Sequence, residues 1–286
     1  MICDPRYNRN IGAQANKNND HNDVASSPAA RLLRLRELKE VYHPPQMHRA
    51  IFKSAAKQYL EMTRQQTQIK LKIKNKFRAW QVTQLGAQQV YHLRHREKFL
   101  KQLNHPDLVG QFSILYELLQ SAQQAQRQSL QQLCQLGKRY NEIQQFLKIP
   151  GVGPITAHLF DAYIQDPHRF ATKQKLWRYA QLGIVDRSSN GKPLGYRRLD
   201  RNGNSLLKHI SYQIWKASLQ TKQPNEVRDY FQCSLNTTGN RIHARLNTQR
   251  KILAVMWTVW KHQQAYQAQK FIAAAQPELV TRTQPS

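Results

Sequence analysis

Two adjacent serines, Ser188 and Ser189, lie in a glycine-containing stretch that carries several cations. The stretch reads Asp186-Arg187-Ser188-Ser189-Asn190-Gly191-Lys192-Pro193-Leu194-Gly195 and continues into Tyr196-Arg197-Arg198. A serine hydroxyl can attack the phosphorus of a phosphodiester, and neighbouring guanidinium and ammonium groups stabilise the charge that develops. Ser-Ser-Asn-Gly is also an ordinary turn sequence, so the residues by themselves leave both interpretations open.

A second candidate for phosphate chemistry is the turn sequence Ile149-Pro150-Gly151-Val152-Gly153-Pro154. Its two glycines allow the backbone to turn sharply and to approach a ligand closely. A helix that begins near Ile155 would present free N–H groups and its positive dipole end to an anion. The pattern is that of a helix-hairpin-helix element, which grips the nucleic-acid backbone without reading bases. A plain tight turn between two packed helices is the alternative.

Helices with an apolar stripe must position these segments. Apolar residues recur every three to four positions over residues 46–80, which predicts one long amphipathic helix with basic outer faces. A similar stripe over residues 111–136, amid many glutamines, predicts one arm of a helical hairpin or short coiled coil. Two further helices are predicted over residues 173–182 and 205–219, with an irregular stretch between them that contains the serines.

The last predicted helix carries Arg241 and Arg245 and continues to Trp260. The two arginines are one turn apart and share a face, which suits a further phosphate contact. Residues from about Gln263 onward lose this periodicity, and a mobile tail is expected there.

The charge of the chain points to a polyanionic partner. Lys and Arg outnumber Asp and Glu by 44 to 17, for a formal net charge of +27 and a pI of about 10.3. Such a surplus repels itself, and binding to a polyanion releases condensed counterions. Nucleic acid is favoured over an anionic membrane surface, because the basic residues are dispersed over all 286 residues instead of lying in one helix or tail.

The composition argues against several other classes of protein. The longest nearly unbroken apolar run, Ile252 to Trp260, is far shorter than the ~20 residues that span a bilayer. Cys3, Cys134 and Cys233 lie far apart and form no CxxC pair, so neither a disulfide framework nor a zinc ribbon is indicated. No signal-peptide pattern begins the chain, and a reducing, cytoplasmic compartment is expected.

The run from Ile149 to Asn204 resembles the C-terminal domain of the Piv/MooV-type family of DNA invertases and insertion-sequence transposases. Members of this family join an N-terminal RuvC-like domain, which has the RNase H fold and a DEDD set of acids, to a C-terminal domain with a helix-hairpin-helix and a serine. Upstream, the run from Ile2 to Tyr42 is similar to the last strand and last acidic helix of that nuclease-like domain.

The resemblance implies roles for individual residues. Ser189 is the implied nucleophile, because the family's serine usually precedes a small turn residue, and Ser188 is the close alternative. Asp20 and Asp23 are the implied last two acids of the DEDD set and ligands of Mg²⁺, since carboxylates three residues apart on a helical turn point the same way. Without the resemblance, this spacing is more often a pair of solvated acids. The candidate DNA contacts are Gly151, Val152, Gly153, Arg187, Lys192, Arg197, Arg198, Arg241 and Arg245.

The expected fold is mainly α and has four parts. Residues 1–82 are the C-terminal remainder of an α/β RNase H-like (RuvC-like) domain with a basic helix, and residues 83–145 form a glutamine-rich helical hairpin or coiled coil. Residues 146–262 are a transposase C-terminal domain with the helix-hairpin-helix and the serine loop, and residues 263–286 are a mobile tail. We also expect the glycine turn and the loop around Ser189 to lie close together and to hold one DNA phosphate.

The expected activity is that of a transposase or site-specific recombinase of an insertion sequence, which cuts and rejoins DNA through a covalent serine–DNA link. DNA is the expected partner, and a guide RNA is a second candidate because some members of the family use one. A homo-oligomer and a nucleoid-associated location in the cytoplasm, away from membranes, are also expected. The family's first Asp and its Glu have no counterpart here, which predicts a truncated copy with weak or no activity. The alternative is a non-catalytic DNA- or RNA-binding protein that uses the helix-hairpin-helix and the basic helices.

Overall fold

The structure is a computed structural model that describes residues 42, 44–86, 89–103, 105–189 and 192–273. The side chains of residues 187–189, 192–194, 196–197 and 272–273 are not among those described. The chain divides into two compact units, residues 1–50 and 51–286. The predicted remnant of a RuvC-like domain, including Asp20 and Asp23, lies outside the described residues.

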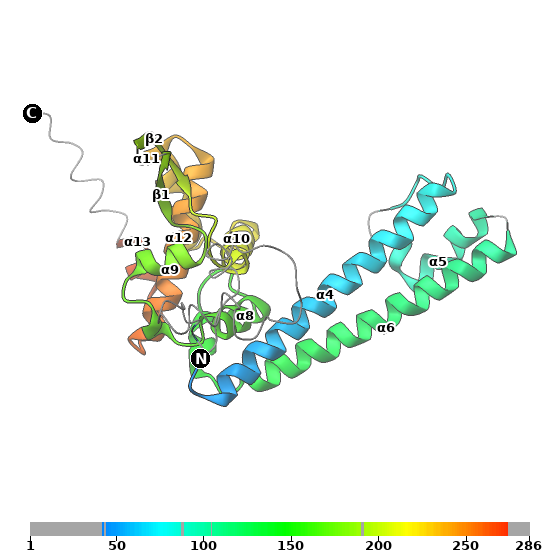
Figure 1. Ribbon diagram of the computed structural model, residues 1–286, viewed down its shortest axis with the longest axis horizontal. Helices are drawn as coiled ribbons and strands as arrows, with labels where there is room; N and C mark the ends of the chain where they lie inside the picture. Colours follow the sequence, from blue (N-terminus) through cyan, green and yellow to red (C-terminus); the bar gives the residue numbers. More distant parts are fainter. Residues whose placement is uncertain (1–41, 43, 87–88, 104, 190–191, 274–286) are drawn as a thin grey trace, which may run out of the picture. The chain divides into compact units, whose positions relative to one another are not determined.

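Two long helices form an arm. Helix α4 (Met47–Ala79) and helix α6 (Pro106–Gly137) run antiparallel, and η2 (Gln89–Tyr91), α5 (Leu93–Leu100) and η3 (Lys101–Leu103) lie between them in the sequence (Figure 1). The centroid of the Phe77 ring lies 4.2 Å from that of Phe112 near one end of the pair. The buried apolar residues that hold this part together, the arm cluster, are Ile69, Ile73, Phe77, Val82, Val90, Phe99, Leu103, Phe112, Tyr116 and Leu119.

The predicted helix over residues 46–80 is confirmed, and most of its apolar positions are buried as predicted. Ala55, Ile73 and Phe77 are buried as the periodicity predicts. Ile51 and Trp80, which keep the apolar spacing near the two ends of the predicted range, are 49% and 53% exposed. The partner of α6 in the arm is α4, so the predicted division at residue 82 separates two helices that pack on each other.

The remaining helices form a body around α12. This body contains α7 (Asn141–Phe146), α8 (Pro154–Ile164), η4 (Pro167–Arg169), α9 (Lys173–Tyr179), α10 (Ser205–Gln220), α11 (Glu226–Thr238), α12 (Arg241–Lys261) and α13 (Ala268–Ala273). Helix α12 contacts α7, α9, α10 and α11, because apolar side chains on several of its faces are buried. The body cluster gathers the buried apolar side chains of these helices together with Phe52 and its neighbours on α4 and Leu133 on α6.

Asparagine side chains fix where three body helices begin. The side chain of Asn204 accepts a hydrogen bond from Leu206 N at the start of α10, at 2.9 Å. The side chains of Asn225 and Asn240 cap α11 and α12 in the same way. These caps satisfy N–H groups that have no carbonyl partner within the helix.

Two predictions for the body need correction. The stretch expected to be irregular is a β-hairpin of β1 (Ile184–Ser189) and β2 (Lys192–Leu199), paired antiparallel. The chain after Gln263 does not become a mobile tail at once, because α13 packs on α11 and buries Phe271 completely. Residues 274–286 of the predicted tail lie outside the described residues.

Candidate nucleic-acid interface

The glycine turn joins two helices, as the sequence predicts, and it packs against a third. Gly151 has a φ of 85°, in the left-handed region that favours glycine. A Cβ added to Gly151 would lie 2.3 Å from the carbonyl oxygen of Ile214 and 2.8 Å from the amide nitrogen of Ser218, both on α10. The close backbone approach that this glycine permits is therefore an approach to α10.

The start of α8 faces open space. Gly153 is the N-cap residue and Pro154 follows it in the first turn. The Gly153 N–H donates to Thr156 Oγ1 at 3.0 Å, which uses one of the terminal donors. The N–H groups of Ile155 and Thr156 lie in the first helical turn, where the helix supplies no carbonyl for them. An added Cβ at Gly153 would meet no atom within 4 Å, so this end of the helix is open to an anion.

The two candidate serines lie at the tip of the hairpin. In the backbone register, Ser188 is opposite Pro193 and Ser189 is opposite Lys192. The register shifts between Asp186 and Ser188, so that β2 has two more residues than β1 at this point, and Gly195 there has a φ of 70°. Such an irregularity bends a strand and re-aims its side chains. The side chains of Arg187, Ser188, Ser189, Lys192 and Arg197 are not described, and their roles stay predictions.

The base of the hairpin is fixed to the helices on either side of it. Asp200 N donates to Gly183 O at 2.8 Å, which closes the two strands. Arg178 Nε lies 3.6 Å from Asp200 Oδ2, and Asn204 N donates to Tyr179 O at 2.6 Å. The hairpin therefore rises from a rigid point between α9 and the first turn of α10.

A basic groove lies beside this base. It has a volume of about 370 Å³ and is lined by Leu199 at the end of β2, by side chains of α10 and by side chains of α12. Its basic members are Lys208, His209 and Arg245, and no carboxylate is among the described residues that line it.

Arg245 is the predicted DNA contact that the structure places best. Its guanidinium lies 5.7 Å from the centroid of the Tyr212 ring, which holds it in the groove. Its Nε is buried and has no hydrogen-bond acceptor among the described residues. Arg245 as a whole is partly exposed. A phosphate oxygen on its guanidinium would form a charge-assisted hydrogen bond.

Among the other predicted contacts, Arg241 and Arg198 are exposed. Arg241 is the first residue of α12, one turn before Arg245, and Arg198 lies opposite Val185 in the hairpin. Lys208 and His209 were not among the contacts predicted from the sequence. The apolar periodicity of α10 could have identified them, because it places both residues outside the face that packs on the core.

The turn and the hairpin lie against different halves of α10. Gly151 approaches α10 at Ile214 and Ser218, whereas Lys208 and His209 line the groove at the hairpin base. Lys208 and Ser218 are about 15 Å apart along a helix that rises 1.5 Å per residue. In Figure 1, α10 lies between α8 and the hairpin. The turn and the base of the hairpin thus meet α10 at different points, and a single phosphate held by both segments stays a prediction.

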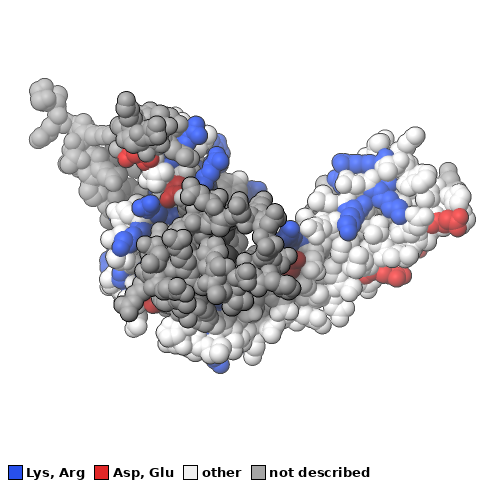
Figure 2. Space-filling model, in the orientation of Figure 1, with Lys and Arg blue, Asp and Glu red and all other residues white. Residues whose placement is uncertain are grey.

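Basic residues are also spread over the arm. Figure 2 shows Lys and Arg side chains on one face of both the arm and the body. On the arm, the ammonium groups of Lys70 and Lys76 lie 5.5 Å and 5.3 Å from the ring centroids of Tyr91 and Phe112. These stems cover apolar surface while their charges stay accessible to a polyanion.

Two further observations concern classes of site. Within the described part of the chain, no group of three or more His, Cys, Asp or Glu residues is arranged to hold a metal ion. None of the helices in the described ranges combines the length and the apolar character that crossing a bilayer requires.

A family comparison covers the turn and the hairpin together. Residues 143–232 match the model of the transposase IS116/IS110/IS902 family. The matched region begins in α7, contains the glycine turn, both strands and α10, and ends in α11. No curated protein matches the chain. The match covers less than half of the sequence, and it supports an insertion-sequence transposase that acts on DNA.

Proposed function

We propose that this protein is a DNA-binding transposase of an insertion sequence that cuts and rejoins DNA strands with a serine nucleophile. The observation that carries the proposal is that one transposase family match contains both the glycine turn and the serine hairpin. The basic groove with the unpartnered Nε of Arg245 lies at the base of the same hairpin, which gives the DNA backbone a place to bind.

DNA contacts at two points of the backbone agree with this arrangement. The N-terminus of α8 receives one phosphate and the groove at Arg245 receives another. The two points are separated along α10, because Gly151 packs near Ser218 whereas Lys208 lines the groove about 15 Å nearer the start of the helix. Such contacts set the position of the duplex and leave base recognition to other parts of the protein or to a guide RNA.

The proposed reaction conserves the energy of the phosphodiester. The Oγ of Ser189 attacks phosphorus, a P–Oγ bond forms, and a P–O bond to one deoxyribose breaks. The serine proton passes to solvent or a base, and the released sugar oxygen takes up a proton. A second sugar hydroxyl then attacks the serine ester and restores a DNA strand. Arg and Lys beside the hairpin stabilise the charge on the phosphate oxygens in both steps.

The metal assistance in this proposal comes from the family resemblance. Mg²⁺ held by Asp20 and Asp23 would neutralise charge on the reacting phosphate. Both acids lie outside the described residues.

A homo-oligomer is proposed from described residues. Ile114 and Leu118 lie one turn apart on α6 and are 66% and 49% exposed. A second copy of this apolar face is the simplest cover for it.

The nucleophile is tested by trapping a covalent adduct. The full chain is incubated with end-labelled nicked duplex DNA and Mg²⁺, and adducts are separated on a denaturing gel. We expect a low yield of adduct in the wild-type chain, its loss in Ser189→Ala and its retention in Ser188→Ala. Loss in Ser188→Ala alone would move the role to Ser188. An adduct of wild-type yield in the double variant would exclude a serine nucleophile.

A non-catalytic DNA- or RNA-binding function is the second candidate, because the net charge of +27 and the groove suffice for binding. This candidate predicts steeply salt-dependent binding without a metal requirement and without any adduct. Duplex binding measured with and without Mg²⁺, beside the adduct assay, separates the two functions.

A further inference from the structure

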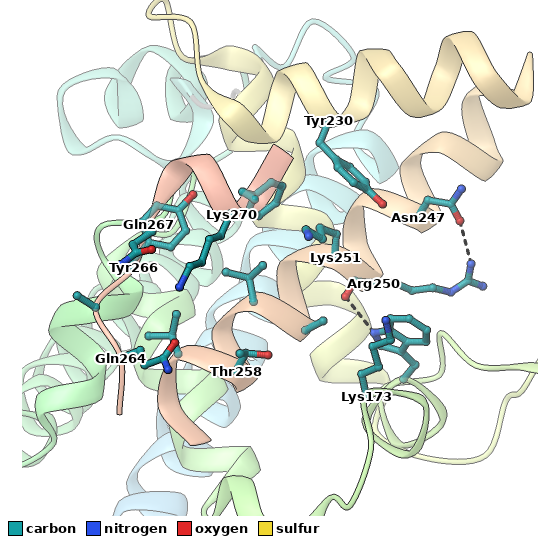
Figure 3. Close-up of a pocket in the computed structure, with 16 residues that line it drawn as sticks. Lys173, Tyr230, Asn247, Arg250, Lys251, Thr258, Gln264, Tyr266, Gln267 and Lys270 are labelled. Carbon is teal, nitrogen blue, oxygen red and sulfur yellow. Dashed lines mark hydrogen bonds between the residues drawn. The ribbon is translucent and has the colours of Figure 1, made fainter. Parts of the chain in front are cut away.

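A second basic cavity lies on the body, away from the hairpin. Its volume is about 480 Å³, within the range of sites that hold small ligands, and it lies between α9, α11, α12 and α13. Figure 3 shows this pocket. Four of the side chains that line it are cationic, namely Lys173, Arg250, Lys251 and Lys270. No carboxylate is among the described residues that line it, and the other lining side chains include aromatic and aliphatic ones.

Lys251 is the central cation of the pocket. It lies on α12, and Figure 3 shows it between Lys270 of α13 and Lys173 of α9 in that view. Its ammonium is 5.8 Å from the ring centroid of Tyr230 and 5.5 Å from that of Phe271. Burial and, to a lesser extent, the charge of Lys173 lower the pKa of Lys251. An anion in the pocket would offset both effects, because it neutralises the charge that is poorly solvated and repelled.

Arg250 forms a fixed wall beside Lys251. Its Nε donates to Leu182 O at 2.8 Å and its Nη1 donates to Asn247 Oδ1 at 3.1 Å. The Trp177 indole N–H donates to Arg250 O at 3.0 Å. These bonds hold Arg250 and Trp177 in place before a ligand arrives, so this wall requires little ordering on binding.

The rest of the pocket suits a base. The partly exposed apolar and aromatic residues that line the pocket include Ala254, Val255 and Tyr266. The Tyr266 hydroxyl is bonded to Glu226, which fixes the ring at the edge of the pocket. Bases of single-stranded nucleic acid pack on aromatic side chains with little dependence on sequence.

We propose that this pocket binds one unstacked nucleotide of a single-stranded nucleic acid, with the phosphate on Lys251, Lys173 and Lys270 and the base on the apolar wall. The proposal rests on the proposed function only in taking nucleic acid as the partner, and it does not depend on the serine chemistry. Arg245 in the groove and Lys251 in the pocket are about 9 Å apart along α12 and lie on different faces of it, so the pocket is a site separate from the groove.

The test uses the full chain and short labelled oligonucleotides. Fluorescence anisotropy measures binding of a hexathymidylate and a hexauridylate, each with a 5′-phosphate, over a series of salt concentrations. Lys251→Gln removes the central charge, and Ala254→Leu fills the cavity without changing any charge. Lys222→Gln is the matched control, because Lys222 is exposed and does not line the pocket. Lys270→Gln, on an exposed position, replaces Lys251→Gln if that variant fails to fold.

We expect Lys251→Gln and Ala254→Leu to weaken oligonucleotide binding about tenfold and Lys222→Gln to change it less than twofold. The slope of log K against log salt should fall by about 0.7 in Lys251→Gln, the value for one phosphate contact in a single strand. Tighter binding of one oligonucleotide assigns the site to DNA or to RNA.

Three results would overturn the proposal. The first is binding within twofold of wild type in both pocket variants, and the second is equal weakening in all lysine variants with none in Ala254→Leu. The third is competition by inorganic phosphate as strong as that by thymidine monophosphate, which would leave only an anion site. If the wild-type chain forms no serine adduct but its pocket binds oligonucleotides as expected, the result would count against the proposed function alone.

Discussion

Replacing Gly151 by alanine tests the packing of the glycine turn on α10. The new methyl group would meet the Ile214 carbonyl oxygen at 2.3 Å and the Ser218 amide nitrogen at 2.8 Å. Both are backbone atoms inside a helix, so neither can move aside without disturbing α10. The φ of 85° adds a second cost, because a side chain is disfavoured in this region.

The two costs set the expected magnitude. A left-handed conformation costs an L-residue about 1–2 kcal/mol. Forcing an extra carbon into a packed site costs about 1–3 kcal/mol. Gly151→Ala should therefore lower the free energy of unfolding by about 2–5 kcal/mol, which corresponds to a fall in Tm of roughly 5–15 °C.

Gly153→Ala is the matched control, since it adds the same methyl group two residues later. The backbone there has a φ of −97°, and the added carbon would meet nothing within 4 Å. We expect a change within about 1 kcal/mol, because a weaker helix cap and a less flexible unfolded chain offset each other. Urea denaturation followed by circular dichroism measures both variants. Equal denaturation midpoints for the two would refute the packing of the turn on α10.

Three further substitutions test other parts of the structure. Burial, followed by the charges of Arg169 and Lys57, lowers the pKa of Lys53 from 10.5 to about 8, so the unfolded chain holds this proton more tightly than the folded one. Between pH 7 and pH 10.5, the free energy of unfolding of wild type should therefore rise relative to that of Lys53→Met by about 1–1.5 kcal/mol. The full pKa shift corresponds to about 3.4 kcal/mol, and this value is reduced because solvent screens the half-exposed ammonium. Equal gains in urea titrations of both proteins would contradict this. Phe77→Ala should destabilise the arm by about 3–5 kcal/mol and speed amide exchange there, while protected amides in the body keep their rates. Asn225→Ala removes the cap of α11 and a bond to Ser218 O and should cost about 2 kcal/mol in denaturant unfolding, against less than 0.5 kcal/mol for the exposed Asn236→Ala.

The long helices could be predicted from the sequence because their burial is periodic. The residues that face the arm and body clusters recur every three to four positions in α4, α6 and α10. The prediction of burial failed near the ends of the helix, where Ile51 and Trp80 keep the period but are about half exposed. Periodicity indicates which face is apolar, and only the partner element decides how far along the helix that face is covered.

The hairpin was missed although its signal was present. Asn190-Gly191 is a common two-residue connection between antiparallel strands, and Ser189 and Lys192 pair on either side of it. The flanking residues are polar and basic, and they lack the alternation of apolar residues that usually marks strands. The charged composition that suggested a catalytic loop thus concealed a strand pair.

Sites assembled from distant segments were beyond prediction. The pocket cations come from α9, α12 and α13, and nothing in the spacing of Lys173, Lys251 and Lys270 shows that they meet. The turn was predicted correctly, but the reason for Gly151 was not, since the atoms that exclude a side chain belong to α10. A single sequence identifies a residue that must be small without naming its neighbour.

The two clusters also determine the order in which parts of the chain can fold during synthesis. All buried members of the arm cluster lie between Ile69 and Leu119, so this part can fold as soon as it has left the ribosome. The body cluster extends from Phe52 to Phe271, and the Phe52 ring packs 4.7 Å from that of Tyr140, so the first turns of α4 must wait for much later segments to be translated. A nascent chain therefore carries a folded arm beside exposed apolar residues of α4. Until the body has been translated, chaperones or rapid folding must protect these residues from aggregation.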